Sequence, residues 1–332
     1  MSNVRTIRPL DAAIAVIAVV VLILGAYLGY SVWAQSRQVV GSTPAARAVA
    51  EIEAKVRKNP NDIDARMQLA QALAVAGRDK DSVTQYEAAL KISKNFAPAI
   101  SGIGFLALQR KDYAKGEKYF RRVIEILEPK HKSGPDAQLE IAYFYLGTAL
   151  MEQKEYEEAA NYYKKAILLR RDASDTHYAL AFTYNKLGSE SKYREELENT
   201  LLFDPKMPEA NYDYALLLLK DGDKAGAAEH LRTAITAAPT VDLPQDALAE
   251  LGPFADRFAA AKAAKDPKAA LVEARIAVAL EPENVEALVL LGDLAVKTGA
   301  KKHATEMYQR VLVIEPNNAS AKAGLEKVNN GK

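Results

Sequence analysis

The chain has 332 residues, of which 49% are hydrophobic and 26% are charged, and its formal net charge at pH 7 is +1. A near-neutral chain lacks the basic excess that nucleic-acid binding normally requires, so we expect no nucleic-acid partner. The absence of cysteine excludes disulfide bonds, thiolate metal sites and cysteine nucleophiles.

A long apolar segment lies near the N-terminus, where no charged residue occurs from Ala12 to Ser36. Three aromatic residues lie at its far end: Tyr27, Tyr30 and Trp33. At about 1.5 Å per residue a helix of this length spans a hydrocarbon core of roughly 30 Å, and aromatic rings favour the headgroup level. We therefore predict a cytoplasmic tail at residues 1–11 and a transmembrane helix at residues 12–33. A signal peptide cleaved near Ala34 is the alternative.

The charges beside this segment nearly balance, with Arg5 and Arg8 before it and Arg37 and Arg47 after it. Short positively charged tails tend to stay cytoplasmic, whereas long domains translocate largely regardless of charge. We expect a single-pass protein of the cytoplasmic membrane, within the cell envelope. The larger part of the chain would then lie on the extracytoplasmic side, which is the periplasm in a bacterium with two membranes.

Residues 34–42 form a predicted linker. Thr43 and Pro44 then mark a helix start, with threonine as the N-cap and proline at the first helical position. We predict a capping helix at residues 43–60, whose apolar stripe covers the exposed face of the elements that follow.

A fixed period governs the sequence from here on. One row of mostly small residues recurs at steps of 34 or 43 residues: Ala70, Gly104, Gly147, Ala181, Ala215, Phe258 and Gly292. A second row keeps the same phase: Ser82, Gly116, Ala159, Tyr193, Ala227, Ala270 and Ala304. A third row is mostly bulky: Tyr86, Phe120, Tyr163, Leu197, Leu231, Ala274 and Tyr308. Small residues at two points and a large one at a third allow two antiparallel helices to cross closely.

The stretch 285–318 shows the pattern most completely: Leu288, Leu291, Gly292, Ala295, Ala304, Tyr308, Val311 and Pro316. This pattern and the 34-residue period resemble the tetratricopeptide repeat. The resemblance implies an all-α fold, a right-handed α-solenoid of helix-turn-helix repeats, with seven repeats within residues 63–318. Together with the apolar N-terminal segment, it makes the chain similar to bacterial-type membrane-anchored members of that family.

The seven predicted repeats are 63–96, 97–130, 140–173, 174–207, 208–241, 251–284 and 285–318. Repeat 251–284 departs furthest, since Arg257 and Phe258 replace its large and small residues, and we expect its first helix to be shifted by one residue. Insertions at 131–139 and 242–250 break the period. Insertions in such arrays often lie on a binding face, although a longer turn or an extended helix start is the plainer interpretation. Residues 319–332 form a predicted C-terminal capping helix and tail.

No catalytic pattern occurs in the sequence. The four histidines are scattered, without metal-ligand spacing: His131, His177, His230 and His303. No phosphate-binding glycine loop or nucleophile elbow is present. The basic pair Arg170 and Arg171 is interpreted as an ordinary solvated helix face. We expect no enzyme activity, cofactor, metal or small-molecule substrate.

The resemblance implies a groove, because the first helix of each repeat lines the concave face in this family. The fifth, ninth and twelfth positions point into that groove, and the middle of the array offers these side chains there: Phe105, Phe144, Tyr178, Phe182, Asn185, Tyr212 and Leu216. Aromatic side chains often dominate binding energy, and an apolar groove suits an amphipathic helix or an extended peptide. Packing of these rings on the neighbouring repeat is the alternative.

The lysine and asparagine that bind peptide C-termini in one subfamily are absent from the fifth and ninth positions, so that co-chaperone role is not expected. The sequence therefore predicts a membrane-anchored scaffold or assembly factor that binds a protein or peptide partner. A constitutive structural subunit of a larger membrane complex is the alternative.

Overall fold

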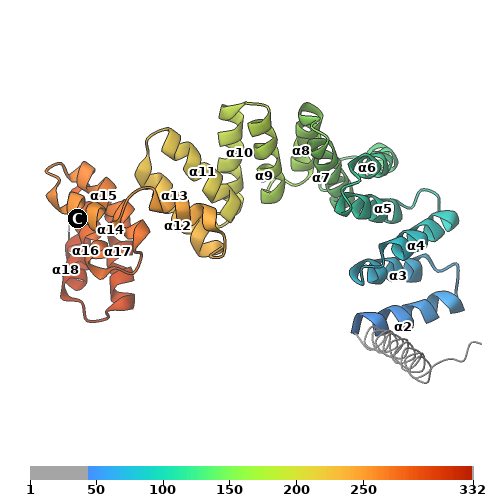
Figure 1. Cartoon of the computed structure of the whole chain (residues 1–332), viewed down its shortest axis with the longest axis horizontal. Helices are drawn as coiled ribbons and strands as arrows, with labels where there is room; N and C mark the ends of the chain where they lie inside the picture. The colour runs from blue at the N-terminus through green and yellow to red at the C-terminus, as the bar shows by residue number, and fades with distance from the viewer. Residues whose placement is uncertain (1–43, 331–332) are drawn as a thin grey trace, which may run out of the picture. The chain divides into compact units, whose positions relative to one another are not determined.

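The computed structural model describes residues 44–330, and every regular element in this range is helical (Figure 1). These residues form 17 α-helices and one 3₁₀ helix, which confirms the predicted all-α fold class. The predicted tail at residues 1–11, the transmembrane helix at 12–33 and the linker at 34–42 lie outside the described residues. Within residues 44–330, no helix combines the length and apolar character needed to cross a bilayer.

The chain divides into two compact units between Lys132 and Ser133, inside the first predicted insertion. The described elements of the first unit are α2 (Pro44–Lys58), α3 (Ile63–Val75), α4 (Asp79–Ile92), α5 (Ala97–Gln109), α6 (Tyr113–Leu127) and the 3₁₀ helix η1 (Glu128–Lys130).

The second unit begins with three helix pairs: α7 (Ala137–Glu152) and α8 (Tyr156–Leu169), α9 (Ser174–Lys186) and α10 (Glu190–Phe203), and α11 (Pro208–Lys220) and α12 (Lys224–Ala237). The remaining helices are α13 (Asp242–Ala249), α14 (Phe254–Ala263), α15 (Pro267–Leu280), α16 (Val285–Lys297), α17 (Lys301–Ile314) and α18 (Ala319–Asn330).

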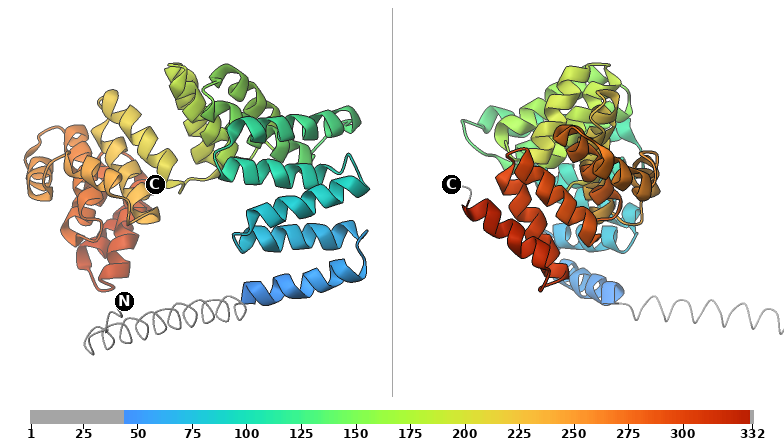
Figure 2. Two further views of the ribbon diagram at one scale, coloured as in Figure 1. Left: turned by 45° about the vertical axis from the view of Figure 1, so that its right-hand side comes forward. Right: turned by 90° about the vertical axis from the view of Figure 1, so that its left-hand side faces the viewer.

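Successive helices pack in pairs, and, except at α12, the second helix of one pair contacts the first helix of the next pair within the same unit. In the first unit, α4 lies against α5 in this way (Figure 2). In the second unit, α8 packs on α9 and α10 packs on α11. Each pair buries one side against its neighbour, so the hydrophobic core of each unit runs as a seam from pair to pair.

The close crossing of paired helices depends on size matching between the first and third rows of the repeat. A methyl group built on Gly147 would lie 2.8 Å from Cε1 of Tyr163, and one on Gly292 would lie 2.7 Å from Cε1 of Tyr308. Both tyrosine side chains are fully buried. Where the bulky position holds leucine, as at Leu197, the small position holds alanine. Glycine therefore stands opposite the rings of Tyr163 and Tyr308 and alanine opposite Leu197, whereas the first repeat departs from this match by pairing Ala70 with Tyr86.

The turn within each described helix pair except α14–α15 places one residue in the left-handed region. Gly188 has a φ of +68° and Gly222 has a φ of +87°, a conformation that glycine adopts without steric cost. Lys111 and Lys154 occupy the equivalent position with φ of +59° and +68°. The packing of the two helices thus fixes the turn conformation even where the residue does not favour it.

The repeat at 251–284 is irregular. Its first helix, α14, begins at Phe254, three residues after the start of the 34-residue frame, and has 10 residues. The preceding insertion at 242–250 contains the short helix α13, and α12 packs against α13 and α15. The size order is also reversed in this repeat, because Phe258 occupies the position that is small elsewhere and Ala274 the position that is bulky elsewhere. Phe258 packs on a core cluster in which Ala274 is fully buried.

Single helices flank the pairs at both ends of the described residues. Val49 and Val56 of α2 form one apolar cluster with Leu69 and Leu73 of α3. At the other end, α18 packs against α16 and α17. Both helices cover the apolar side of a neighbouring pair, which is the role expected of a capping helix.

Candidate functional site

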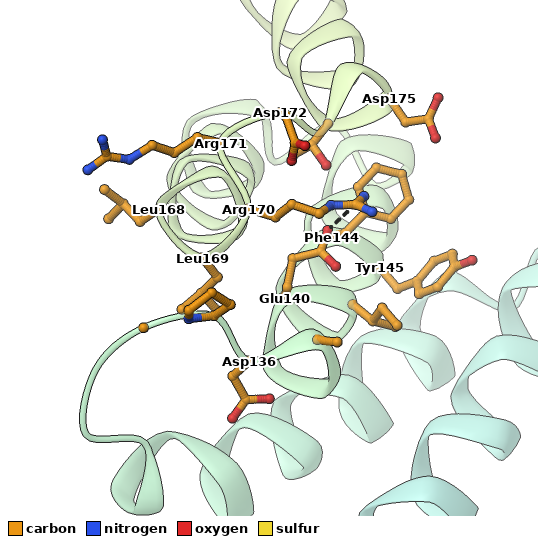
Figure 3. A pocket seen from close by; sticks show the side chains of 15 residues that line it. Asp136, Glu140, Phe144, Tyr145, Leu168, Leu169, Arg170, Arg171, Asp172 and Asp175 are labelled. Atoms are coloured by element: carbon orange, nitrogen blue, oxygen red, sulfur yellow. Dashed lines mark ion pairs between the residues drawn. The ribbon is translucent and has the colours of Figure 1, made fainter. Parts of the chain in front are cut away.

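A cavity of about 670 Å³ lies between α7, α8 and α9 of the second unit (Figure 3). Its apolar wall comprises Pro135, Ala137, Ile141, Phe144, Tyr145, Leu168 and Leu169. Its charged wall comprises Asp136, Glu140, Arg170, Arg171, Asp172 and Asp175. Gly134 and Thr176 complete the lining. We refer to it as the α7–α9 cavity.

Local structure explains why these residues gather. Asp136 caps α7 by accepting hydrogen bonds from the backbone N–H of Gln138 at 3.1 Å and of Leu139 at 3.0 Å. On the other side, α8 ends at Leu169, and Arg170 takes an extended conformation that turns the chain toward α9. The start of α7 and the turn between α8 and α9 therefore face the same space.

An ion pair crosses the cavity. Arg170 Nη2 lies 3.2 Å from Oε1 of Glu140, whose side chain is nearly buried (Figure 3). Burial raises the pKa of Glu140, and the charge of Arg170 opposes that rise. The guanidinium thus supports an ionised carboxylate that would otherwise be costly to bury.

His177 holds the turn that carries Arg170. Its Nδ1 lies 2.7 Å from Oε2 of Glu196, and its Nε2 lies 3.0 Å from the backbone oxygen of Arg171. Burial lowers the pKa of His177, but the hydrogen bonds to these acceptors and the charge of Glu196 raise it above its usual value. Both ring nitrogens face acceptors, so the imidazolium form satisfies both contacts as a donor.

Apolar side chains reach solvent at the cavity. Leu168 is 74% exposed and Ile141 is 44% exposed, and both belong to the wall. The hydroxyl of Thr176, another wall residue, is buried and has no hydrogen-bond partner among the described residues. Buried polar groups are normally paired, but Thr176 is 0% exposed, so its hydroxyl lies beneath the cavity surface and not on it.

A smaller cavity of about 160 Å³ lies between α9, α11 and the segment leading into α13. Its lining comprises Tyr178, Pro208, Glu209, Tyr212, Asp213, Ala238, Val241, Leu243 and Pro244. Tyr178 Oη donates a hydrogen bond to Oδ2 of Asp213 at 3.0 Å. Burial raises the pKa of Asp213, and hydrogen bonds from Tyr178 and Tyr193 oppose that rise. This network ties α9, α10 and α11 together. We refer to the space as the α9–α11 cavity.

The predicted groove residues occupy several places. Phe144 lines the α7–α9 cavity, and Tyr178 and Tyr212 line the α9–α11 cavity. Their place in the walls agrees with the expectation for the fifth position, although a binding role stays a prediction.

The other four predicted residues line neither cavity. The ring of Phe182 lies beneath Lys186, whose Nζ is 4.7 Å from the ring centroid. Asn185 and Leu216 are exposed on α9 and α11. Phe105 is exposed on α5 in the first unit. For these residues too, the predicted binding role is untested.

Sequence reasoning missed Glu140, Leu168, Arg170 and Thr176. Arg170 was expected to be a solvated surface residue and is 54% exposed, but the expectation did not include the ion pair of its guanidinium with the nearly buried Glu140. The penultimate leucine of α8 was no sufficient signal, because α10 carries the exposed Leu202 at the same position and Leu202 lines neither cavity. Within residues 44–330, no group of three or more acidic or histidine side chains is arranged to hold a metal ion.

Comparison with known families gives three matches. Models described as tetratricopeptide repeat match residues 42–100 and 190–242, and one described as TPR repeat matches residues 136–188. Among curated proteins, the chain is 23% identical over 147 residues to BBSome complex member BBS4 of Bos taurus, covering 44% of this chain and 26% of that protein. It is 26% identical over 106 residues to uncharacterized protein ycf37 of Cyanophora paradoxa, covering 32% of this chain and 59% of that one.

Solved structures with similar folds include YrrB, a TPR protein described as having an unusual peptide-binding site. It has a TM-score of 0.47 and 17% identity over 59% of this chain and 96% of that chain. MamA has a TM-score of 0.45 and 19% identity over 51% and 94%. PilF of Pseudomonas aeruginosa has a TM-score of 0.47 and 16% identity over 82% and 100%. At these identities, structural likeness indicates nothing about partners or pathway.

Proposed function

We propose a protein-binding role for this chain, which belongs to the tetratricopeptide repeat family. Proteins of this family are generally non-catalytic interaction scaffolds, because stacked helix pairs present extended surfaces. Here the partner would be a protein or peptide segment that binds in the α7–α9 cavity. The observation that carries the proposal is the combination of exposed Leu168 and Ile141 with the ion pair of Glu140 and Arg170 in one cavity.

The dimensions and chemistry of the cavity support this role. Ligand sites are concave and mostly apolar, with a few polar groups that fix orientation. The α7–α9 cavity matches that description, since Phe144 and Tyr145 form its floor with rings 5.2 Å apart and Glu140 and Arg170 supply charge. An extended peptide would place an apolar side chain against the leucine and isoleucine.

We further propose that the apolar segment at residues 12–33 anchors this scaffold in the cytoplasmic membrane, with the repeats on the extracytoplasmic side. This proposal comes from the uncharged apolar segment and its flanking residues. The partner would then be a protein of the cell envelope. A permanent structural subunit of a membrane complex is the alternative outcome of the experiment below.

The test is a pull-down of the tagged full-length chain from mild detergent, with mass spectrometry of the captured proteins. Leu168→Ser is the probe, and Leu202→Ser is the matched control, because Leu202 is 70% exposed at the same repeat position and lines neither cavity. Burying one leucine on binding contributes about 1–2 kcal/mol, so we expect roughly a tenfold loss of capture with Leu168→Ser alone.

Each result has a definite meaning. A partner lost with Leu168→Ser and kept with Leu202→Ser supports binding in the cavity. Partners at fixed stoichiometry that survive both changes favour a structural subunit. If both variants lose the partner equally, the cavity is not the binding site.

A further inference from the structure

The two cavities of the second unit share the first turns of α9. Asp175 and Thr176 line the α7–α9 cavity, and Tyr178 lines the α9–α11 cavity. Asp175 and Tyr178 are three residues apart in one helix, so they are neighbours on its surface. A single extended segment that crosses α9 at this point can reach both spaces.

Acidic groups outnumber basic groups in these walls. The two linings contain six carboxylates, on Asp136, Glu140, Asp172, Asp175, Glu209 and Asp213, and two guanidinium groups, on Arg170 and Arg171. The α9–α11 cavity has no basic residue in its lining. The surface therefore has a formal excess of negative charge, although the whole chain is near neutral.

Some carboxylates of the two linings already have a partner within the protein, and others are exposed to solvent. Arg170 pairs with Glu140, and the partly buried Asp213 accepts hydrogen bonds from two tyrosines. Asp172, Asp175 and Glu209 are exposed. The side chain of Arg171 extends away from Asp172 and Asp175 (Figure 3).

Apolar contacts accompany this acidic surface on both sides. Leu168 and Ile141 are exposed at the first cavity, and Leu243 and Val241 are exposed at the second. Each cavity can therefore take an apolar side chain of a partner next to the acidic groups.

We infer that the partner segment is an extended cationic peptide that lies across the first turns of α7, α9 and α11 and places one apolar side chain in each cavity. This inference rests on the proposed function and adds the chemistry of its partner. Lysine or arginine side chains of the peptide would lie beside Asp172, Asp175 and Glu209. An acidic segment would meet the same carboxylates without compensation, and like charges in contact oppose binding.

The test uses a displayed library of randomised short peptides, selected on the immobilised full-length protein. Peptides that also bind the Leu168→Ser variant are removed, so that the remaining binders depend on the α7–α9 cavity. Their composition is then determined by sequencing. We expect these peptides to be cationic and to contain spaced apolar residues.

A charge variant sharpens the test. For a selected peptide, Asp172→Asn combined with Asp175→Asn should weaken binding about two- to fivefold for each carboxylate at low salt. The matched control is Glu283→Gln with Glu326→Gln, which removes the same charge from the turn before α16 and from α18. This control should leave the affinity unchanged.

The possible results separate the two proposals. Cavity-dependent binders that are cationic and sensitive to the aspartate changes support the inference. Cavity-dependent binders that are neutral or acidic overturn the inference and leave the proposed function standing. If no binder depends on Leu168, the proposed function fails, and the inference fails with it.

Discussion

The substitution Gly147→Ala tests how this chain matches side-chain sizes between paired helices. In an exposed helix this change stabilises by about 1 kcal/mol, because alanine has the higher helix propensity. Here the new methyl would lie 2.8 Å from Cε1 and 2.9 Å from Cδ1 of Tyr163. That ring is fully buried, contacts Phe144 with ring centroids 5.8 Å apart, and donates a hydrogen bond to Thr148 Oγ1 at 3.2 Å. It therefore has little freedom to move.

Overpacking of a buried site costs about 1–3 kcal/mol. After subtraction of the gain in helix propensity, we expect Gly147→Ala to lower the free energy of unfolding by about 1 kcal/mol. Tyr163→Leu alone leaves space beside the glycine and should also destabilise. In that background, however, Gly147→Ala recreates the alanine–leucine pair of Ala181 and Leu197, so the same change should stabilise by about 0.5–1 kcal/mol.

Urea unfolding followed by circular dichroism measures the four members of this double-mutant cycle. The decisive quantity is the sign of the Gly147→Ala effect in each background. If Gly147→Ala stabilises the protein while Tyr163 is present, the close crossing of α7 and α8 does not limit residue size, and the explanation for the glycine is wrong.

Two predictions concern pH. The pKa of His177 is raised overall, so its contribution to stability is complete below the unfolded pKa of about 6.5 and is lost as the pH rises through the folded pKa. The difference in unfolding free energy between wild type and His177→Gln should therefore shrink above about pH 6.5. A difference that stays constant with pH in urea titrations would contradict this. Arg170→Met should raise the pKa of Glu140 further, because burial already raises it and the guanidinium opposes that rise. Since a raised carboxyl pKa costs stability as the pH rises, this variant should lose about 1 kcal/mol at pH 7 and almost nothing at pH 4, and equal losses at both would exclude the ion pair as the cause.

The periodic rows of the sequence were sufficient to predict the helix pairs, because the crossing of two helices imposes a local size rule on each repeat. Gly147 with Tyr163 and Ala181 with Leu197 follow this rule directly. The rule does not hold in the first repeat, where Ala70 accompanies Tyr86. It also fails at Phe258, where the size order reverses and α13 precedes the shortened α14. That arrangement depends on how an inserted helix packs against α12, which periodicity does not encode.

The fifth position of the repeat identified Phe144, Tyr178 and Tyr212, because helical spacing fixes the direction of a side chain. The ion pair of Glu140 with Arg170 was not accessible in this way. It requires the extended conformation at the end of α8, which brings two distant residues together.

A recurring polar contact at the fourth position was also hidden in the sequence. His177 contacts a backbone oxygen six residues earlier and a side chain 19 residues later. Arg66 makes equivalent hydrogen bonds to Pro60 and Gln85. Because histidine makes these contacts in one repeat and arginine in another, no single residue type at the fourth position predicts them.

Site-specific photo-crosslinking in cells tests the central claim most directly. A benzophenone amino acid replaces Ile141, which is exposed in the wall of the α7–α9 cavity, and the control replaces Leu202, which lies outside both cavities. We predict that illumination produces a defined adduct with a partner protein from position 141 and none from position 202. Adducts of equal yield from both positions, or from position 202 alone, would contradict binding in the cavity.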